Sequence, residues 1–95
     1  MEVLSKQEKI DALYALIAQL HTPEECRAFF DDLCTCKEIE KMAERVYAAK
    51  LLMAGNTYNQ VISKADISSA TLSRVSRCVQ YGSGYSRVLK KPGEE

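Results

Sequence analysis

The side chains best suited to chemistry in this chain are hydroxyl and guanidinium groups on one short segment. In SSATLSRVSRCV, which starts at Ser68, small hydroxyl residues and two arginines (Arg74 and Arg77) alternate with apolar residues three or four positions apart. Hydroxyls can contact bases or phosphates, and a guanidinium group fits the acceptor edge of guanine or a phosphate oxygen. The segment therefore predicts a helix that presents a polar face to a nucleic acid.

Residues 57–79 as a whole predict a helix-turn-helix, which places its second helix in the DNA major groove. Val61, Ile62 and Ala65 form an apolar stripe on the predicted first helix. Alanine is usual at the position of Ile62, so a bulky residue there indicates a slightly wider crossing of the two helices.

The predicted turn and second helix follow the same pattern. Glycine is usual at the position of Asp66, and Asp is one of the residues that tolerate the left-handed conformation. Ile67 would fill the gap between the helices, and Ser68 is a good N-cap. Leu72 and Val75 would face inward.

The residues expected to contact DNA share small or polar side chains on the outward faces of the two helices. They are Tyr58, Asn59, Gln60 and Lys64 on the first helix and Ser69, Ala70, Thr71, Ser73, Arg74 and Arg77 on the second. The first group would touch the backbone and the second would contact base edges or phosphates. Arg87, Lys90 and Lys91 would add attraction that salt weakens. The alternative is a helical hairpin whose polar face is merely solvated.

The distribution of charge supports this interpretation. Residues 1–55 carry seven Lys and Arg against ten Asp and Glu, whereas residues 56–91 carry six Lys and Arg against Asp66. The positive charge therefore collects in and after the helix-turn-helix, where a polyanion would dock.

Length and composition predict one domain at 1–91 followed by a frayed tail at 92–95. A hydrophobic content of 46% argues against disorder. The sequence has no apolar run near the ~20 residues that span a bilayer, and its polar N-terminus does not resemble a signal peptide. We expect a cytoplasmic protein without a membrane partner.

The cysteines and the single histidine do not predict a catalytic or metal site. We expect Cys26, Cys34, Cys36 and Cys78 to be free thiols, because their spacing is not that of a structural zinc site. His21 lies at a helix end with no acid or nucleophile at a readable spacing. No cofactor, metal or enzymatic activity is expected.

The remaining chain predicts further helices, so the fold class is all-α with five to six helices. The apolar periodicity and the capping residues Thr22 and Thr35 place helices at 6–20, at 23 to about 30–33, and at 36–54, with a stop at Gly55 and a last helical turn at 86–91. The buried face of the third helix is predicted at Ile39, Met42, Ala43, Val46, Ala49 or Lys50, and Met53, widened by Leu51 and Leu52.

The amphipathic helices leave two assemblies open. One is a monomeric bundle. The other is a homodimer in which the N-terminal helices pack against the second copy. A dimer would place two recognition helices about 34 Å apart, one turn of DNA.

With these elements in place, the chain resembles the Trp repressor superfamily, most closely its YerC/YecD-like branch. The resemblance rests on TCKEIEKMAERVYAAKLLMAG and on SRVSRCVQYGSGY, which starts at Ser73. It implies an intertwined, all-helical homodimer that binds operator DNA.

The resemblance also implies a possible effector pocket. Thr35, Arg45 and Arg74 match positions that hold tryptophan in the Trp repressor. Val75 stands where that protein has glycine, and Cys78 stands where it has a serine that helps to bind the ligand's amino group. A valine narrows the slot and a thiol is a poor partner for an ammonium, so a tryptophan corepressor is not expected.

The sequence therefore predicts a DNA-binding transcriptional regulator, a repressor that acts on double-stranded DNA. The alternative is a dimeric helical protein-interaction module in which the helix-turn-helix is structural.

Overall fold

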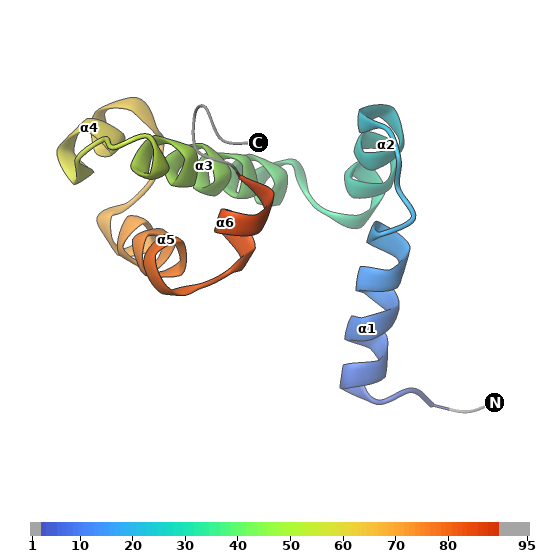
Figure 1. The fold of residues 1–95 in the computed structure, drawn as a ribbon. Helices are drawn as coiled ribbons and strands as arrows, with labels where there is room; N and C mark the ends of the chain where they lie inside the picture. Colours follow the sequence, from blue (N-terminus) through green and yellow to red (C-terminus); the bar gives the residue numbers. More distant parts are fainter. Residues whose placement is uncertain (1–2, 90–95) are drawn as a thin grey trace. The chain divides into compact units, whose positions relative to one another are not determined.

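A computed structural model describes residues 3–89 of the chain, and it confirms the all-α fold class (Figure 1). It contains six helices in this part of the chain: α1 (Lys6–Ile17), α2 (Pro23–Leu33), α3 (Cys36–Met53), α4 (Tyr58–Lys64), α5 (Ser69–Tyr81) and α6 (Gly84–Val88). The chain divides into two compact units at the boundary between Cys36 and Lys37. The single domain over 1–91 stays a prediction.

In the N-terminal unit, α1 starts from a capping box. The Ser5 hydroxyl accepts a hydrogen bond from the Glu8 backbone N–H at 3.1 Å, and the Glu8 carboxylate accepts one from the Ser5 N–H at 2.8 Å. The Ser5 backbone bond lowers the pKa of Glu8 below its usual value, because it stabilises the charged form.

Helix α1 ends at Ile17, three residues before the predicted end at Leu20. The amides of Gln19 and Leu20 donate to carbonyls three residues back, those of Leu16 and Ile17, at 3.0 and 3.1 Å. The chain thus tightens into a turn, which local apolar spacing does not reveal.

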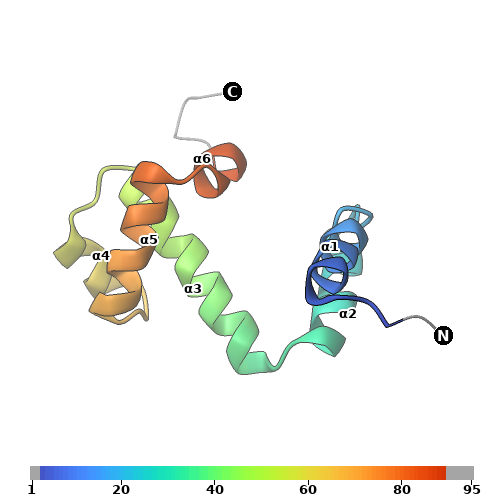
Figure 2. The same ribbon diagram turned by 90° about the horizontal axis from the view of Figure 1, so that it is seen from below.

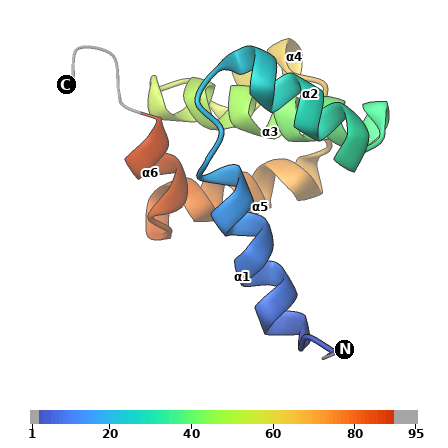
Figure 3. The same ribbon diagram turned by 90° about the vertical axis from the view of Figure 1, so that its right-hand side faces the viewer.

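Helix α2 begins as predicted, with Thr22 as N-cap, Pro23 at the first position and Glu25 completing a capping box. It lies beyond the end of α1 in the vertical direction of Figure 1, and Figure 3 shows the two helices at an angle. The rings of Phe29 and Phe30 meet edge to face, 5.7 Å apart.

The apolar side chains of α1 are at most partly covered. None of its twelve residues is buried. Ile10 is 45% exposed, Leu16 is 51% exposed and Tyr14 is 65% exposed. An amphipathic helix is stabilised in water chiefly by packing its apolar face, so this one requires a partner surface.

In the C-terminal unit, α3 ends in a Schellman motif. Gly55 has φ of 97°, the left-handed conformation that favours glycine. Its N–H donates to the Leu52 carbonyl and the Asn56 N–H donates to the Leu51 carbonyl, both at 3.0 Å. The predicted stop after α3 is thereby confirmed.

The core of this unit joins three helices. Ala48 of α3, Val61 and Ala65 of α4, and Leu72 of α5 are buried together. Partly buried Leu51, Leu52 and Ile67 pack against them. The core therefore holds α4 and α5 on the C-terminal half of α3, as Figure 2 shows.

Two predictions about the helix-turn-helix are wrong. Ile62 is 43% exposed and does not belong to the buried stripe. Successive residues of a helix are about 100° apart, so Ile62 points to a different side from Val61. Ala65, one turn after Val61, lies on the same side as Val61 and is buried. The turn at Asp66 does not use the left-handed conformation, since no described residue other than glycine has a positive φ.

The predicted face of α3 is wrong in part. Of the alternatives Ala49 and Lys50, Ala49 is the buried one, but Ala43 and Val46 are exposed, and Ala48, which was not predicted, lies in the core. Val46 lines an apolar cavity with Tyr85, Val88 and Leu89 of the region around α6.

Helix α6 begins at Gly84, two residues earlier than predicted. A tight turn precedes it, since a Cβ at Gly82 would lie 2.7 Å from the Cys78 carbonyl oxygen. Lys90, Lys91 and the predicted tail at 92–95 lie outside the described residues. Within the described part of the chain, every helix is too short or too polar to cross a membrane.

The core predicts unequal effects at two aliphatic positions. Leu72→Ala should lower the free energy of unfolding by about 2–5 kcal/mol, because it leaves a cavity among three helices. Ile62→Ala, at an exposed site, should cost less than about 1 kcal/mol. Urea unfolding followed by circular dichroism measures both, and equal losses would contradict this description of the core.

Candidate nucleic-acid interface

The first helix of the motif, α4, starts from a reciprocal cap. The Thr57 hydroxyl accepts from the Gln60 backbone N–H at 3.2 Å, and the Gln60 side-chain oxygen accepts from the Thr57 N–H at 2.8 Å. Gln60 therefore has a structural task in addition to its predicted contact with DNA. Tyr58 and Asn59, in the same turn, are exposed.

Lys64 at the end of α4 is held by the end of α3. Its Nζ donates to Oδ1 of Asn56 at 3.2 Å, and Nδ2 of Asn56 donates to the Leu51 carbonyl at 2.9 Å. The side chain of Lys64 is exposed. Its charge is therefore placed at a defined point of the surface.

The N-terminus of α5 is built on Ser68. The Ser68 hydroxyl accepts from the Thr71 backbone N–H at 3.2 Å and donates to the Thr71 hydroxyl oxygen at 3.0 Å. The predicted N-cap is confirmed. Thr71 is half-buried, whereas the other nine predicted contact residues are exposed.

The outward face of α5 forms a groove of about 640 Å³. Ala70, Ser73, Arg74 and Arg77 line it, together with Cys78, Tyr81 and Gly82. Four of the six contact residues predicted on the second helix are therefore brought together in one groove, with both guanidinium groups beside small side chains, whereas Ser69 and Thr71 do not line it.

Sequence reasoning missed Tyr81 in this groove. Tyr81 is 84% exposed and lies four residues after Arg77 and seven after Arg74, hence on the same face of α5. Because the predicted helix stopped at Val79, this position fell outside it. The helical spacing would have identified Tyr81 had the helix been extended by two residues.

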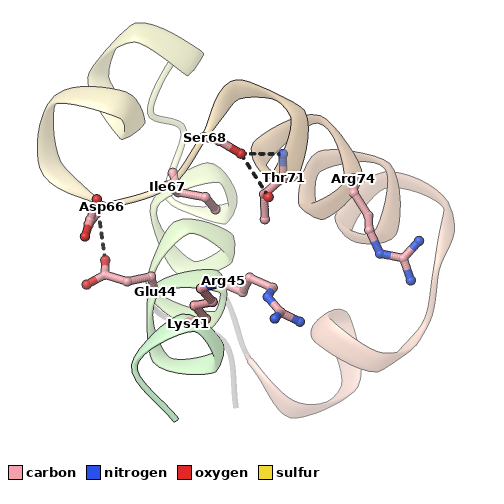
Figure 4. Close-up of a pocket in the computed structure, with 8 residues that line it drawn as sticks. All are labelled: Lys41, Glu44, Arg45, Asp66, Ile67, Ser68, Thr71 and Arg74. Atoms are coloured by element: carbon pink, nitrogen blue, oxygen red, sulfur yellow. Dashed lines mark hydrogen bonds between the residues drawn. The ribbon is translucent and has the colours of Figure 1, made fainter. Parts of the chain in front are cut away.

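A second cavity of about 500 Å³ lies between α3 and the turn of the motif. Its lining is mostly charged or hydroxylated: Lys41, Glu44, Arg45, Asp66, Ile67, Ser68, Thr71 and Arg74. In Figure 4, Arg45 reaches from α3 and Arg74 from α5 toward the same open space.

This cavity contains two of the four residues predicted for an effector pocket, Arg45 and Arg74. Cys78 lines the groove on α5, not this cavity, and Thr35 belongs to the N-terminal unit. Val75 is 1% exposed, so its side chain packs inward instead of lining the cavity.

The cavity also contains an interaction that sequence reasoning missed. The Glu44 carboxylate accepts a hydrogen bond from the Asp66 backbone N–H at 3.0 Å (Figure 4). The two residues are 22 positions apart. Local periodicity and capping rules have no means of detecting such a pair.

The cysteines and acidic residues do not gather into a ligand set. Among the described residues, no group of three or more His, Cys, Asp or Glu side chains is placed to hold a metal ion. The four cysteines are free, with Cys36 exposed and the others half-buried.

Comparisons with known proteins find relatives in both sequence and fold. The family model described as Trp repressor protein matches residues 8–92. YerC of Bacillus subtilis (strain 168) is 45% identical over 88 residues, which cover 92% of this chain and 85% of YerC.

Two solved structures are also similar. A TrpR-like protein from Eubacterium eligens is 37% identical with a TM-score of 0.83, and the match covers 90% of this chain and 89% of the other. A candidate Trp repressor from Staphylococcus aureus is 40% identical with a TM-score of 0.80, covering 85% and 82% of the two chains.

Proposed function

The chain belongs to the Trp repressor family, and we propose that it is a sequence-specific DNA-binding regulator that docks α5 in the major groove. The observation that carries the proposal is the outward face of α5. Along it, small side chains at the N-terminal end are followed by two exposed arginines and an exposed tyrosine. Small groups permit close approach to base edges, and the larger groups can reach further.

The length of α5 suits this placement. A helix of 13 residues is about 20 Å long, and the major groove is about 12 Å wide. With Ser69 and Ala70 inserted first, Arg74 would lie at the base edges or at the groove wall. Arg77 and Tyr81 would lie near the flanking phosphates. The hydroxyl of Tyr81 is suited to donate a hydrogen bond to a phosphate oxygen.

The other predicted contacts are assigned to the DNA backbone. Tyr58, Asn59 and Lys64 of α4 supply two polar side chains and a charge. Lys64 and Arg87 add positive charge to the unit, and their attraction to phosphate falls as salt rises. Thr71 would contact DNA from a fixed position, because its hydroxyl is held by Ser68.

We further propose that the protein acts as a cytoplasmic homodimer. The uncovered apolar side chains of α1 and the exposed Val46 and Tyr47 of α3, at 40% and 44%, offer surface for a second copy. Two copies would present two α5 helices to successive major grooves, and occupation of an operator would block transcription. Repression is therefore the proposed outcome of binding.

Tryptophan is not the proposed corepressor. The cavity that contains Arg45 and Arg74 is lined by five charged residues, and Ile67 is its one aliphatic lining residue. Arg45 and Arg74 could hold a carboxylate and stack on a flat ring, but one aliphatic lining residue offers little apolar wall to enclose an indole.

The proposal predicts a position-dependent loss of DNA binding. Arg77→Ala should weaken binding to a selected operator by about tenfold, because it removes a charge-assisted hydrogen bond to a phosphate, on the order of 1.5 kcal/mol. Arg27→Ala, which removes the same charge from exposed α2, is the matched control and should change affinity far less. Fluorescence anisotropy at two salt concentrations measures the DNA affinity of both variants.

Equal losses of affinity in the two variants would contradict docking through α5. Absence of any binding at low salt would favour a protein-interaction module.

The assembly is tested by sedimentation equilibrium of the full chain. We expect twice the chain mass of 10.7 kDa. Ile10→Glu should shift the protein toward the monomer, because it places a charge on the apolar side of α1, whereas Ala15→Glu, at an exposed position on the opposite side of the helix, should not. A wild-type monomer at micromolar concentration would contradict the proposed dimer.

Isothermal titration calorimetry tests the absence of a tryptophan effect. Titration of tryptophan into the protein should give no heat of binding in the micromolar range, with and without operator DNA. Micromolar affinity would overturn this part of the proposal.

A further inference from the structure

We propose that Glu44 is a positioning residue for DNA recognition, because its carboxylate fixes the turn that leads into α5. The inference rests on the proposed function, since it concerns how the reading helix is held. The observation behind it is the hydrogen bond from the Asp66 N–H to Glu44 Oε1 at 3.0 Å, which joins α3 to the turn across 22 positions.

In the turn, the backbone amide of Asp66 has the Glu44 carboxylate as its hydrogen-bond acceptor. The Ala65 N–H donates to the Val61 carbonyl at 2.8 Å and so completes α4. The Ile67 N–H donates to the Ala65 carbonyl at 3.1 Å, within a tight local turn. Between them, the Asp66 N–H donates to the Glu44 carboxylate. The three consecutive amides are thus satisfied by a carbonyl of α4, by the carboxylate on α3 and by a carbonyl within the turn.

The surroundings of Glu44 suit a charged acceptor. Its side chain is half-buried and shares a cavity with Lys41 and Arg45 of α3 and Arg74 of α5. These three positive charges outnumber the two carboxylates of the cavity, those of Glu44 and Asp66. A carboxylate also accepts a backbone N–H more strongly than a neutral oxygen does. The contact therefore fixes the turn without a glycine in the left-handed conformation.

The consequence for recognition follows from chain order. Ile67, directly after Asp66, packs against the core, and Ser68 then caps α5. A turn free to shift would move the N-terminal end of α5, where Ser69 and Ala70 would meet base edges. Base contacts require fixed geometry, whereas attraction to phosphate depends on charge and tolerates movement. Loss of the contact should therefore affect preference for the operator more than binding to random DNA.

Three variants separate contact, charge and folding. Glu44→Ala removes the acceptor, and Glu44→Gln keeps an oxygen acceptor at the same length while removing the charge. Glu40→Ala is the matched control, because Glu40 is an exposed carboxylate one turn earlier on α3. Each is measured by anisotropy on a selected operator and on a random duplex. The exchange rate of the Asp66 amide proton is measured by nuclear magnetic resonance without DNA.

We expect Glu44→Ala to lower the ratio of operator to random-duplex affinity by about fivefold, the size of one net hydrogen bond. It should also speed exchange of the Asp66 amide. Glu44→Gln should restore most of the ratio and of the protection, and Glu40→Ala should match wild type in both. A melting curve for each variant shows whether the unit remains folded.

Three results would overturn the inference. One is a ratio of operator affinity to random-duplex affinity that is the same in folded Glu44→Ala as in Glu40→Ala. Another is a failure of Glu44→Gln to restore the ratio although it restores the amide's protection. The third is an exchange rate of the Asp66 amide proton that Glu44→Ala leaves unchanged. This measurement is made without DNA, so it tests the contact even if the wild-type protein binds no DNA. A wild-type protein that binds no DNA would refute the proposed function but not the contact between Glu44 and Asp66.

Discussion

The arrangement of the interface depends on the burial of Leu72 among α3, α4 and α5. Leu72 is fully buried, with Val61 and Ala65 of α4 and Ala48 of α3 around it. Full burial of one such aliphatic side chain stabilises a fold by about 1.5–3 kcal/mol, so a few of them account for much of a small unit's stability. Because Leu72 lies on the inner face of α5, its burial turns the hydroxyl and arginine face outward. The same contact thus holds the unit together and orients the proposed reading surface.

The polar interactions add precision to this apolar core. Ser68 ends the turn and begins α5, Asn56 connects α3 to Lys64, and Glu44 accepts the amide of Asp66. The Ser68 bond is local to the start of α5, whereas each of the other two joins a loop or turn to a neighbouring helix. Apolar packing is nondirectional and tolerates small displacements of the helices. Hydrogen bonds are directional, so these bonds restrict such displacements. Reading base edges requires that additional precision.

Local rules predicted much of this structure from the sequence. The spacing of Leu72 and Val75 gave the inner face of α5, and Ser68 gave its start, because both depend on residues within one helical turn. The rules failed where a distant element decides. Ile62 is apolar yet exposed, since α4 is short and one face suffices for its core contact. Glu44 was missed because its partner is 22 positions away. On α3, Ala43 and Val46 were expected on the buried face and are exposed.

The central claim is that α5 reads a specific DNA sequence, and selection of bound duplexes from a random pool tests it most directly. Selection with the full chain should enrich one motif, made of two half-sites related by two-fold symmetry and centred about one helical turn apart. The same motif should emerge with and without added tryptophan. A pool that shows no enriched sequence after selection at moderate salt would contradict the account.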